Sequence, residues 1–125
     1  MQKDESVSVL GEPLDMCGDA PMTGFYRDSY CNTCDEDVGS HTVCVETSKL
    51  FLDYSKAKGN DLSTPAPQFG FAGLTPGDSW CLCAARWLEA YNDGAAPRVF
   101  LSRTHKRALD IIPLDILKQY ATDLN

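Results

Sequence analysis

The sequence lacks a long apolar run, an internal repeat and a Gly/Ser-rich linker over its 125 residues. Crossing a bilayer takes about 20 consecutive apolar residues, so we expect no membrane-spanning helix. Without a linker or repeat, this length predicts one domain. No apolar segment follows the charged first residues, which predicts that there is no secretory leader. We therefore expect a cytoplasmic protein with reduced thiols, and disulfides are disfavoured.

Basic residues are also scarce, because 11 Lys and Arg stand against 18 Asp and Glu, for a net charge of −7. Residues 1–47 hold ten acidic residues and only two basic ones. Binding nucleic acid by neutralising phosphates requires a basic face. The one basic cluster, Arg98 to Arg107 around His105, is expected to be solvated surface. We predict neither a nucleic-acid partner nor a membrane partner.

Local patterns predict a disordered tail over residues 1–6 and a single α+β domain over 7–125, with short strands and three or four helices. The expected elements are a strand over 41–46, a helix over 47–58, a helix from 78–79 to 94, strands over 98–103 and 111–112 around a helical turn, and a helix over 113–121. On the first helix, Leu50, Phe51 and Tyr54 mark the apolar face.

Residues 60–78 form a long loop rich in Pro and Gly. Loops of this length in a small domain are uncommon and often functional. Phe69 and Phe71 either attach this loop to the core or belong to a lid over a binding site.

Cysteine, in contrast, is abundant, with six residues that include the pairs Cys31/Cys34 and Cys81/Cys83. Cys31, Cys34, His41 and Cys44 have the ligand types of a compact zinc site. In a regular strand, however, His41 and Cys44 point to opposite faces, which disfavours a site built from these four alone.

The chemistry open to Cys81 and Cys83 depends on the backbone. In a strand their side chains share one face about 6.6 Å apart, which suits a shared metal. In a helix they diverge, and Cys81 in the first turn is the best nucleophile because the helix dipole stabilises its thiolate. The preceding Pro-Gly-Asp-Ser favours the helix. His41 or His105 is then the candidate base, although His105 is also typical of a solvent-facing residue.

Four segments resemble signatures of one bacterial family, the one catalogued as domain of unknown function 2237. They are Thr23–Asp28, Asp37–Cys44, Gly59–Pro65 and Pro76–Trp87. The resemblance covers about residues 9–121 and implies little about function. It implies family positions at Cys17, Cys31, Cys44, Cys81, Cys83, His41 and His105, but not at Cys34. It also draws attention to six polar loop residues as candidate binding groups or as turn and cap residues: Arg27, Asp28, Asn60, Asp61, Asp78 and Arg86.

Three hypotheses follow. The first is a metal or reactive-thiol site, with zinc as the candidate ion and Cys44, Cys81 and Cys83 as its core; His41, Cys31 and Cys17 are secondary ligands. The second is an enzyme acting on a small molecule, with a Cys81 nucleophile, a His41 or His105 base and the 60–78 loop as lid. The third is an interaction module whose cysteines are structural.

Overall fold

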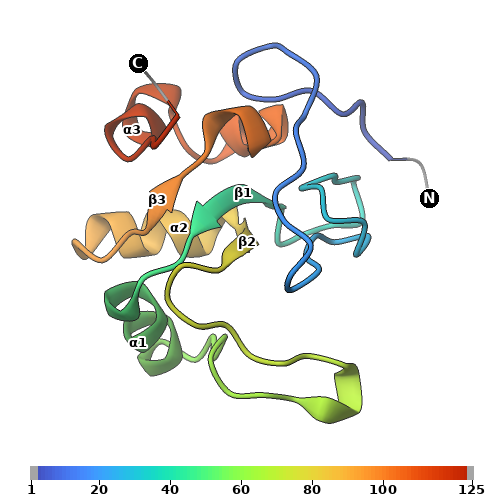
Figure 1. Ribbon diagram of the computed structural model, residues 1–125. Helices are drawn as coiled ribbons and strands as arrows, with labels where there is room; N and C mark the ends of the chain where they lie inside the picture. Colours follow the sequence, from blue (N-terminus) through green and yellow to red (C-terminus); the bar gives the residue numbers. More distant parts are fainter. Residues whose placement is uncertain (1–2, 124–125) are drawn as a thin grey trace.

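A three-stranded antiparallel sheet organises residues 3–123, the part of the chain that the computed structural model describes (Figure 1). The strand order is β2-β1-β3, and three α-helices accompany the sheet within these residues. The elements are β1 (His41–Glu46), α1 (Lys49–Ala57), β2 (Ser79–Cys83), α2 (Ala84–Asn92), β3 (Arg98–Val99) and α3 (Leu114–Gln119). The predicted class, a single small α+β domain, is confirmed.

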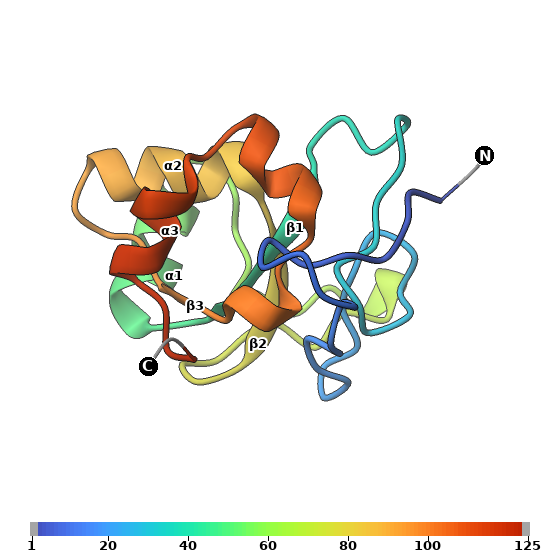
Figure 2. The same cartoon turned by 90° about the horizontal axis from the view of Figure 1, so that it is seen from above.

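The two faces of the sheet have different surroundings. On one face, Val43 and Val45 of β1 lie beside Trp80 and Leu82 of β2 and join the main hydrophobic core. The helices lie on one side of the sheet and the N-terminal loops on the other (Figure 2). Because successive strand residues point to opposite faces, the cysteines between these apolar residues are directed away from the main core.

Helix α1 begins and ends as its sequence predicts. The Ser48 hydroxyl caps its N-terminus by accepting a hydrogen bond from the Phe51 N–H at 3.2 Å, and Gly59, with φ of +90°, follows its C-cap. The predicted apolar face is wrong in one position. Phe51 and Leu52 are buried, whereas Leu50 is 63% exposed.

The chain from Ser79 to Cys83 is a strand, which corrects the predicted helix start at Asp78 or Ser79. This segment pairs with β1 from Glu46 back to His41. The ladder hydrogen bonds and the burial of alternate side chains outweigh the local helix signal. The Asp78 carboxylate instead accepts the Thr75 N–H at 2.9 Å and closes the preceding turn. Helix α2 then starts directly after Cys83, which is its N-cap residue.

The C-terminal third is less extended than expected. Strand β3 has only two residues and is followed by 3-10 turns at Leu101–Arg103 and Lys106–Asp110. The predicted strand at 111–112 is a turn. Ile112 is fully buried there, so its apolar character reflects core packing and not a strand. The final helix follows Pro113 as predicted.

The 60–78 loop is attached to the core at its base. Leu62 and Leu74 are buried and joined by a backbone hydrogen bond of 2.8 Å, and Phe71 contacts Trp80 with ring centroids 5.5 Å apart. Phe69, at the far end of the loop, is 81% exposed. Only one of the two phenylalanines therefore attaches the loop.

The N-terminal segment is held by polar contacts. The Asp4 N–H donates to the Thr33 carbonyl at 2.8 Å, and the Arg107 guanidinium pairs with Asp4 and Asp35. Of the tail predicted over residues 1–6, residues 1–2 lie outside the described residues. None of the helices between residues 3 and 123 is long and apolar enough to cross a bilayer.

The contrast between Phe51 and Leu50 gives a matched test of the core. We expect Phe51→Ala to lower the free energy of unfolding by about 3–5 kcal/mol, because it leaves a cavity in the core. Leu50→Ala, on the adjacent exposed position, should change it by less than about 0.5 kcal/mol. Urea unfolding followed by circular dichroism without reductant measures both. Equal effects would contradict the observed orientation of α1.

Candidate functional site

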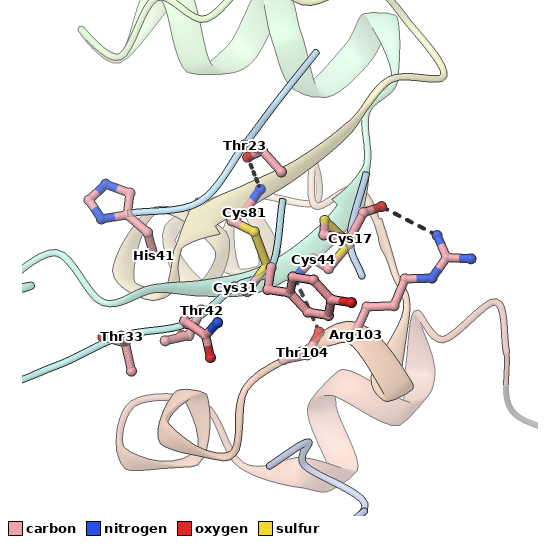
Figure 3. The surroundings of a disulfide bond; sticks show 12 residues. Cys17, Thr23, Cys31, Thr33, His41, Thr42, Cys44, Cys81, Arg103 and Thr104 are labelled. Atoms are coloured by element: carbon pink, nitrogen blue, oxygen red, sulfur yellow. Dashed lines mark hydrogen bonds between the residues drawn. A yellow bond between two sulfur atoms is a disulfide. The ribbon is translucent and has the colours of Figure 1, made fainter. Parts of the chain in front are cut away.

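Four of the six cysteines form two disulfides, Cys17–Cys44 and Cys31–Cys81 (Figure 3). All four are at most 2% exposed and form a small cluster of their own, against which Phe100 packs. The expectation that the chain would carry only free thiols is therefore wrong. The argument from compartment did not consider that the fold brings these residues within bonding distance in two pairs.

The two disulfides are adjacent because their strand cysteines face each other. Cys44 and Cys81 are Cα partners in the β1–β2 ladder. Their N–H groups point away from the partner strand, since Cys81 donates to the Thr23 hydroxyl at 2.8 Å and Cys44 to the Thr104 hydroxyl at 3.2 Å (Figure 3). Such non-hydrogen-bonded pairs have the closest side chains in an antiparallel sheet.

This pairing changes the roles predicted for the cysteines. Cys81 lies in a strand and in a disulfide, so the helix-based argument for it as nucleophile fails. A disulfide sulfur offers no thiolate to a substrate or a metal. The metal role predicted for Cys17, Cys31, Cys44 and Cys81 stays a prediction that concerns only the reduced protein.

A pocket of about 380 Å³ lies beside the cluster. It is bounded by three parts of the chain: the loop before Cys31, the end of the β1–β2 pair with the start of α2, and the base of the 60–78 loop. Its lining residues are Gly24, Phe25, Arg27, His41, Asn60, Leu62, Trp80, Cys81, Leu82, Cys83 and Arg86. The size suits a small molecule. Only the base of the long loop reaches the pocket, and the exposed Phe69 does not.

Cys83 is a free, partly exposed thiol in this pocket. It is the Cα partner of His41 across the β1–β2 pair. Residues paired in this way have Cβ atoms about 5 Å apart. The register shifts between His41 and Val43, and this irregularity disturbs the strict alternation from which we expected His41 and Cys44 to point oppositely. The thiol also lies at the N-terminus of α2, where the backbone dipole is positive.

His41 is held in place by a buried carboxylate. Its Nδ1 lies 2.7 Å from Asp37 Oδ1, and its backbone N–H donates to Asp37 Oδ2 at 2.9 Å. The Asp37 side chain is fully buried, and Thr33 also donates to it at 2.9 Å. Because a carboxylate only accepts hydrogen bonds, Nδ1 is the donor in this contact, and Nε2 has no hydrogen-bond partner among residues 3–123. The imidazole points away from the four disulfide sulfurs (Figure 3).

Two glycines make room for this arrangement. A Cβ on Gly39 would lie 2.9 Å from His41 Cε1, and a Cβ on Gly24 would lie 2.4 Å from the Tyr30 carbonyl oxygen. Gly24 also has φ of +103°, which disfavours other residues. Phe25 stacks on the imidazole, with ring centroids 6.3 Å apart. The pocket wall therefore depends on close backbone approach at both positions.

Two arginines and one amide complete the polar lining. The Arg27 guanidinium lies over the Trp80 ring, 5.3 Å from its centroid, and it has no carboxylate partner among residues 3–123. Arg86 donates to the Lys58 carbonyl at 3.2 Å and pairs with Glu89 at 3.3 Å. Arg27 is therefore the cation free for a ligand, and Arg86 is partly committed to the fold. Asn60 contributes a side-chain amide.

The other candidate polar residues support turns. Asp28 accepts hydrogen bonds from the Tyr30 N–H and the Asn32 amide, and Asp61 accepts those of Ser63 and Thr64. Neither residue lines the pocket. The same holds for Asp78. These contacts are those of turn and cap residues.

His105 lies outside the pocket and is 3% exposed, which corrects its predicted solvent-facing position. Its Nδ1 accepts the Arg107 N–H at 3.0 Å, and its Nε2 lies 2.8 Å from the Glu5 carbonyl. Burial lowers the pKa of this imidazole. Both ring nitrogens are engaged in structural contacts, so His105 is placed to cap the turn that follows it and to hold the N-terminal segment.

Asp37 is a site residue that the sequence patterns did not single out as catalytic or binding. It lies four residues before His41 and opens the family signature Asp37–Cys44. An acidic residue before a Gly-Ser turn and a histidine is the signal from which the contact could have been inferred.

Together, the sheet, the two disulfides and the thiol- and arginine-lined pocket define a small α+β protein whose candidate site is this pocket. The chain belongs to the family DUF2237, described as an uncharacterized protein conserved in bacteria, whose model matches residues 7–121. No curated protein matches the sequence. The resemblance inferred from the four signatures is thus confirmed.

The disulfide pairing predicts a thiol count. We expect the unfolded, unreduced protein to react with a thiol reagent at two cysteines, Cys34 and Cys83, and the reduced protein at all six. In the native state Cys83 should react first, because Cys34 is buried. Peptide mass spectrometry assigns the labels. Six reactive thiols before reduction would contradict both bonds.

His105 should contribute to the pH dependence of stability. Its folded-state pKa is lowered, so the unfolded chain takes up the proton more readily as the pH falls. The stabilisation is complete above the unfolded value of about 6.5 and is lost as the pH drops through the folded value. Urea unfolding between about pH 7.5 and pH 4.5 should show a steeper loss for the native protein than for His105→Gln. Parallel curves would exclude this contribution.

Proposed function

We propose that the protein is an enzyme acting on a small anionic molecule, with Cys83 as nucleophile and His41 as general base. One observation carries this proposal. Cys83 and His41 are cross-strand partners that line one pocket, and the buried Asp37 holds the imidazole. A nucleophile, a base and an acid that orients the base are the recurring parts of covalent catalysis.

The proposed step is acyl transfer. His41 Nε2 takes the proton of the Cys83 thiol while the sulfur attacks the acyl carbon and forms a new S–C bond. The leaving group departs with its bonding electrons and receives that proton from His41. Water, deprotonated by His41, then breaks the S–C bond, releases the acid and restores the thiol. Asp37 stays ionised and stabilises the imidazolium.

The charges in the pocket favour an anionic substrate. Arg27 is a cation without a carboxylate partner among the described residues, and guanidinium groups bind carboxylates and phosphates through paired N–H groups. Asn60 supplies a neutral donor for a developing oxyanion. A pocket of about 380 Å³ limits the substrate to a small molecule.

The third hypothesis, structural cysteines in an interaction module, is supported for the four bonded residues, because they are buried and tie loops to the sheet. It does not account for the pairing of Cys83 with His41. The predicted cytoplasmic location, without a nucleic-acid or membrane partner, stays a prediction. Disulfides are typical of oxidising compartments, and in a reducing cytoplasm the same four residues would be thiols.

The test is the reactivity of Cys83 with iodoacetamide. We expect His41→Ala to slow alkylation of Cys83 by about 100-fold, the lower end of general-base contributions, and Asp37→Asn to slow it by a smaller factor. Peptide mass spectrometry over a time course gives the rate constants, and Cys34→Ser serves as the matched thiol control. An unchanged rate in His41→Ala would refute the role of His41.

Iodoacetate, the anionic form of the same reagent, tests the arginine. The measured quantity is the rate of Cys83 alkylation by iodoacetate divided by the rate with iodoacetamide. We expect this ratio to be higher in the native protein than in Arg27→Gln. Arg98→Gln, at an exposed position in β3 that does not line the pocket, should keep the native ratio. Equal ratios in all three proteins would remove Arg27 from the proposed binding site.

A further inference from the structure

The four bonded sulfurs form one compact cluster. The sulfur atoms of Cys17, Cys31 and Cys81 all lie within 4.8 Å of one another, and the sulfur of Cys44 is 2.08 Å from that of Cys17. They come from two adjacent strands and from both ends of one loop (Figure 3). No other group of three or more metal-binding side chains meets this criterion between residues 3 and 123.

We infer that, once both disulfides are reduced, these four cysteines bind one zinc ion. Zinc takes four thiolates in a tetrahedron at about 2.3 Å, which sets the sulfur–sulfur distances at about 3.8 Å. The Cys17, Cys31 and Cys81 sulfurs already lie within 4.8 Å of one another, with Cys31 and Cys81 bonded at 2.06 Å. Cys44 lies outside this group of three and is joined to it through its bond to Cys17. Reduction releases the two sulfur pairs held at 2.08 and 2.06 Å. Rotation of the cysteine side chains, most of all that of Cys44, then has to bring the four sulfurs to the zinc spacing.

A dithiol can supply the electrons and protons that reduce the two disulfides to four thiols. Each disulfide takes two electrons and two protons from one dithiol, which becomes a disulfide itself. The four thiols then release four protons as they bind Zn²⁺, and the centre carries two negative charges. Arg103 places a cation beside the cluster. Its guanidinium donates to the Cys17 carbonyl at 3.5 Å and stacks on Phe100, with a distance of 4.3 Å to the ring centroid.

This set of four ligands leaves out His41 and Cys83, which were among the ligands predicted from the sequence. His41 and Cys83 line the pocket, where His41 is bound to Asp37, and so they are not part of the sulfur cluster. Cys34 is buried and free, and it is absent from the cluster as well. The zinc ligands thus differ from the proposed catalytic residues His41, Asp37 and Cys83, although Cys81 also lines the pocket.

The experiment is zinc binding by the whole chain in its two redox states. The protein is reduced with a phosphine, which leaves no competing thiol, equilibrated with zinc chloride under nitrogen and desalted. Elemental analysis should find one zinc per reduced chain and none in the unreduced protein. Cobalt(II) in place of zinc should give the intense absorption of thiolate coordination. Reduced protein without bound zinc would overturn the inference.

Variants assign the ligands. Cys44→Ser and Cys31→Ser should each lose the stoichiometric zinc, whereas the double variant Cys34→Ser/Cys83→Ser should keep it. Zinc that depends on Cys83 or Cys34 would refute the assigned set. If the reduced metal-free chain unfolds, far-ultraviolet circular dichroism shows whether zinc binds to a refolded or to an unfolded chain. Zinc should restore the native spectrum, and zinc bound without recovery of that spectrum would show binding to the unfolded chain and overturn the site.

Discussion

The pairing of Cys44 with Cys81 across β1 and β2 is the contact on which the rest of the molecule depends. Each of these residues bonds to one end of the loop between Cys17 and Cys31, so that both ends of the loop are fixed to the same position of the sheet. For sequence separations of 27 and 50 residues, each bond is worth about 3–4 kcal/mol through the lost freedom of the unfolded chain. That tether gives the N-terminal region, which has little regular structure, a defined position.

The pocket follows from this tether. Its loop wall, with Gly24, Phe25 and Arg27, lies between the two bonded cysteines, and its floor is the end of the β1–β2 pair. The disulfides therefore hold the arginine and the aromatic ring against the strand residues that carry the thiol and the imidazole. Structural and candidate chemical roles are divided among cysteines that lie two residues apart in the sequence, Cys81 and Cys83.

Because of this division, the sequence predicted most residues of the pocket but not which cysteine is free. The signatures around His41, Arg27, Asn60 and Cys83 contained most of the pocket, because those residues lie in loops and strand ends that converge. The choice of Cys81 as nucleophile failed because a strong local helix signal precedes it, and only pairing with β1 makes the segment a strand. His105 was misjudged for a related reason, since its burial comes from contact with Glu5, 100 residues away.

The sequence by itself determined the α+β class, strand β1, helix α1 with a cap at Thr47 or Ser48, the final helix after Pro113 and the family. These depend on side-chain alternation, capping and motifs within a few residues of one another. Only the tertiary structure decided which cysteines are bonded, where β2 ends and α2 begins, and that Asp37 holds His41 beside a free thiol. Cysteine pairing depends on distances between segments 27 and 50 residues apart, and such distances are set by the register of the sheet and not by local pattern.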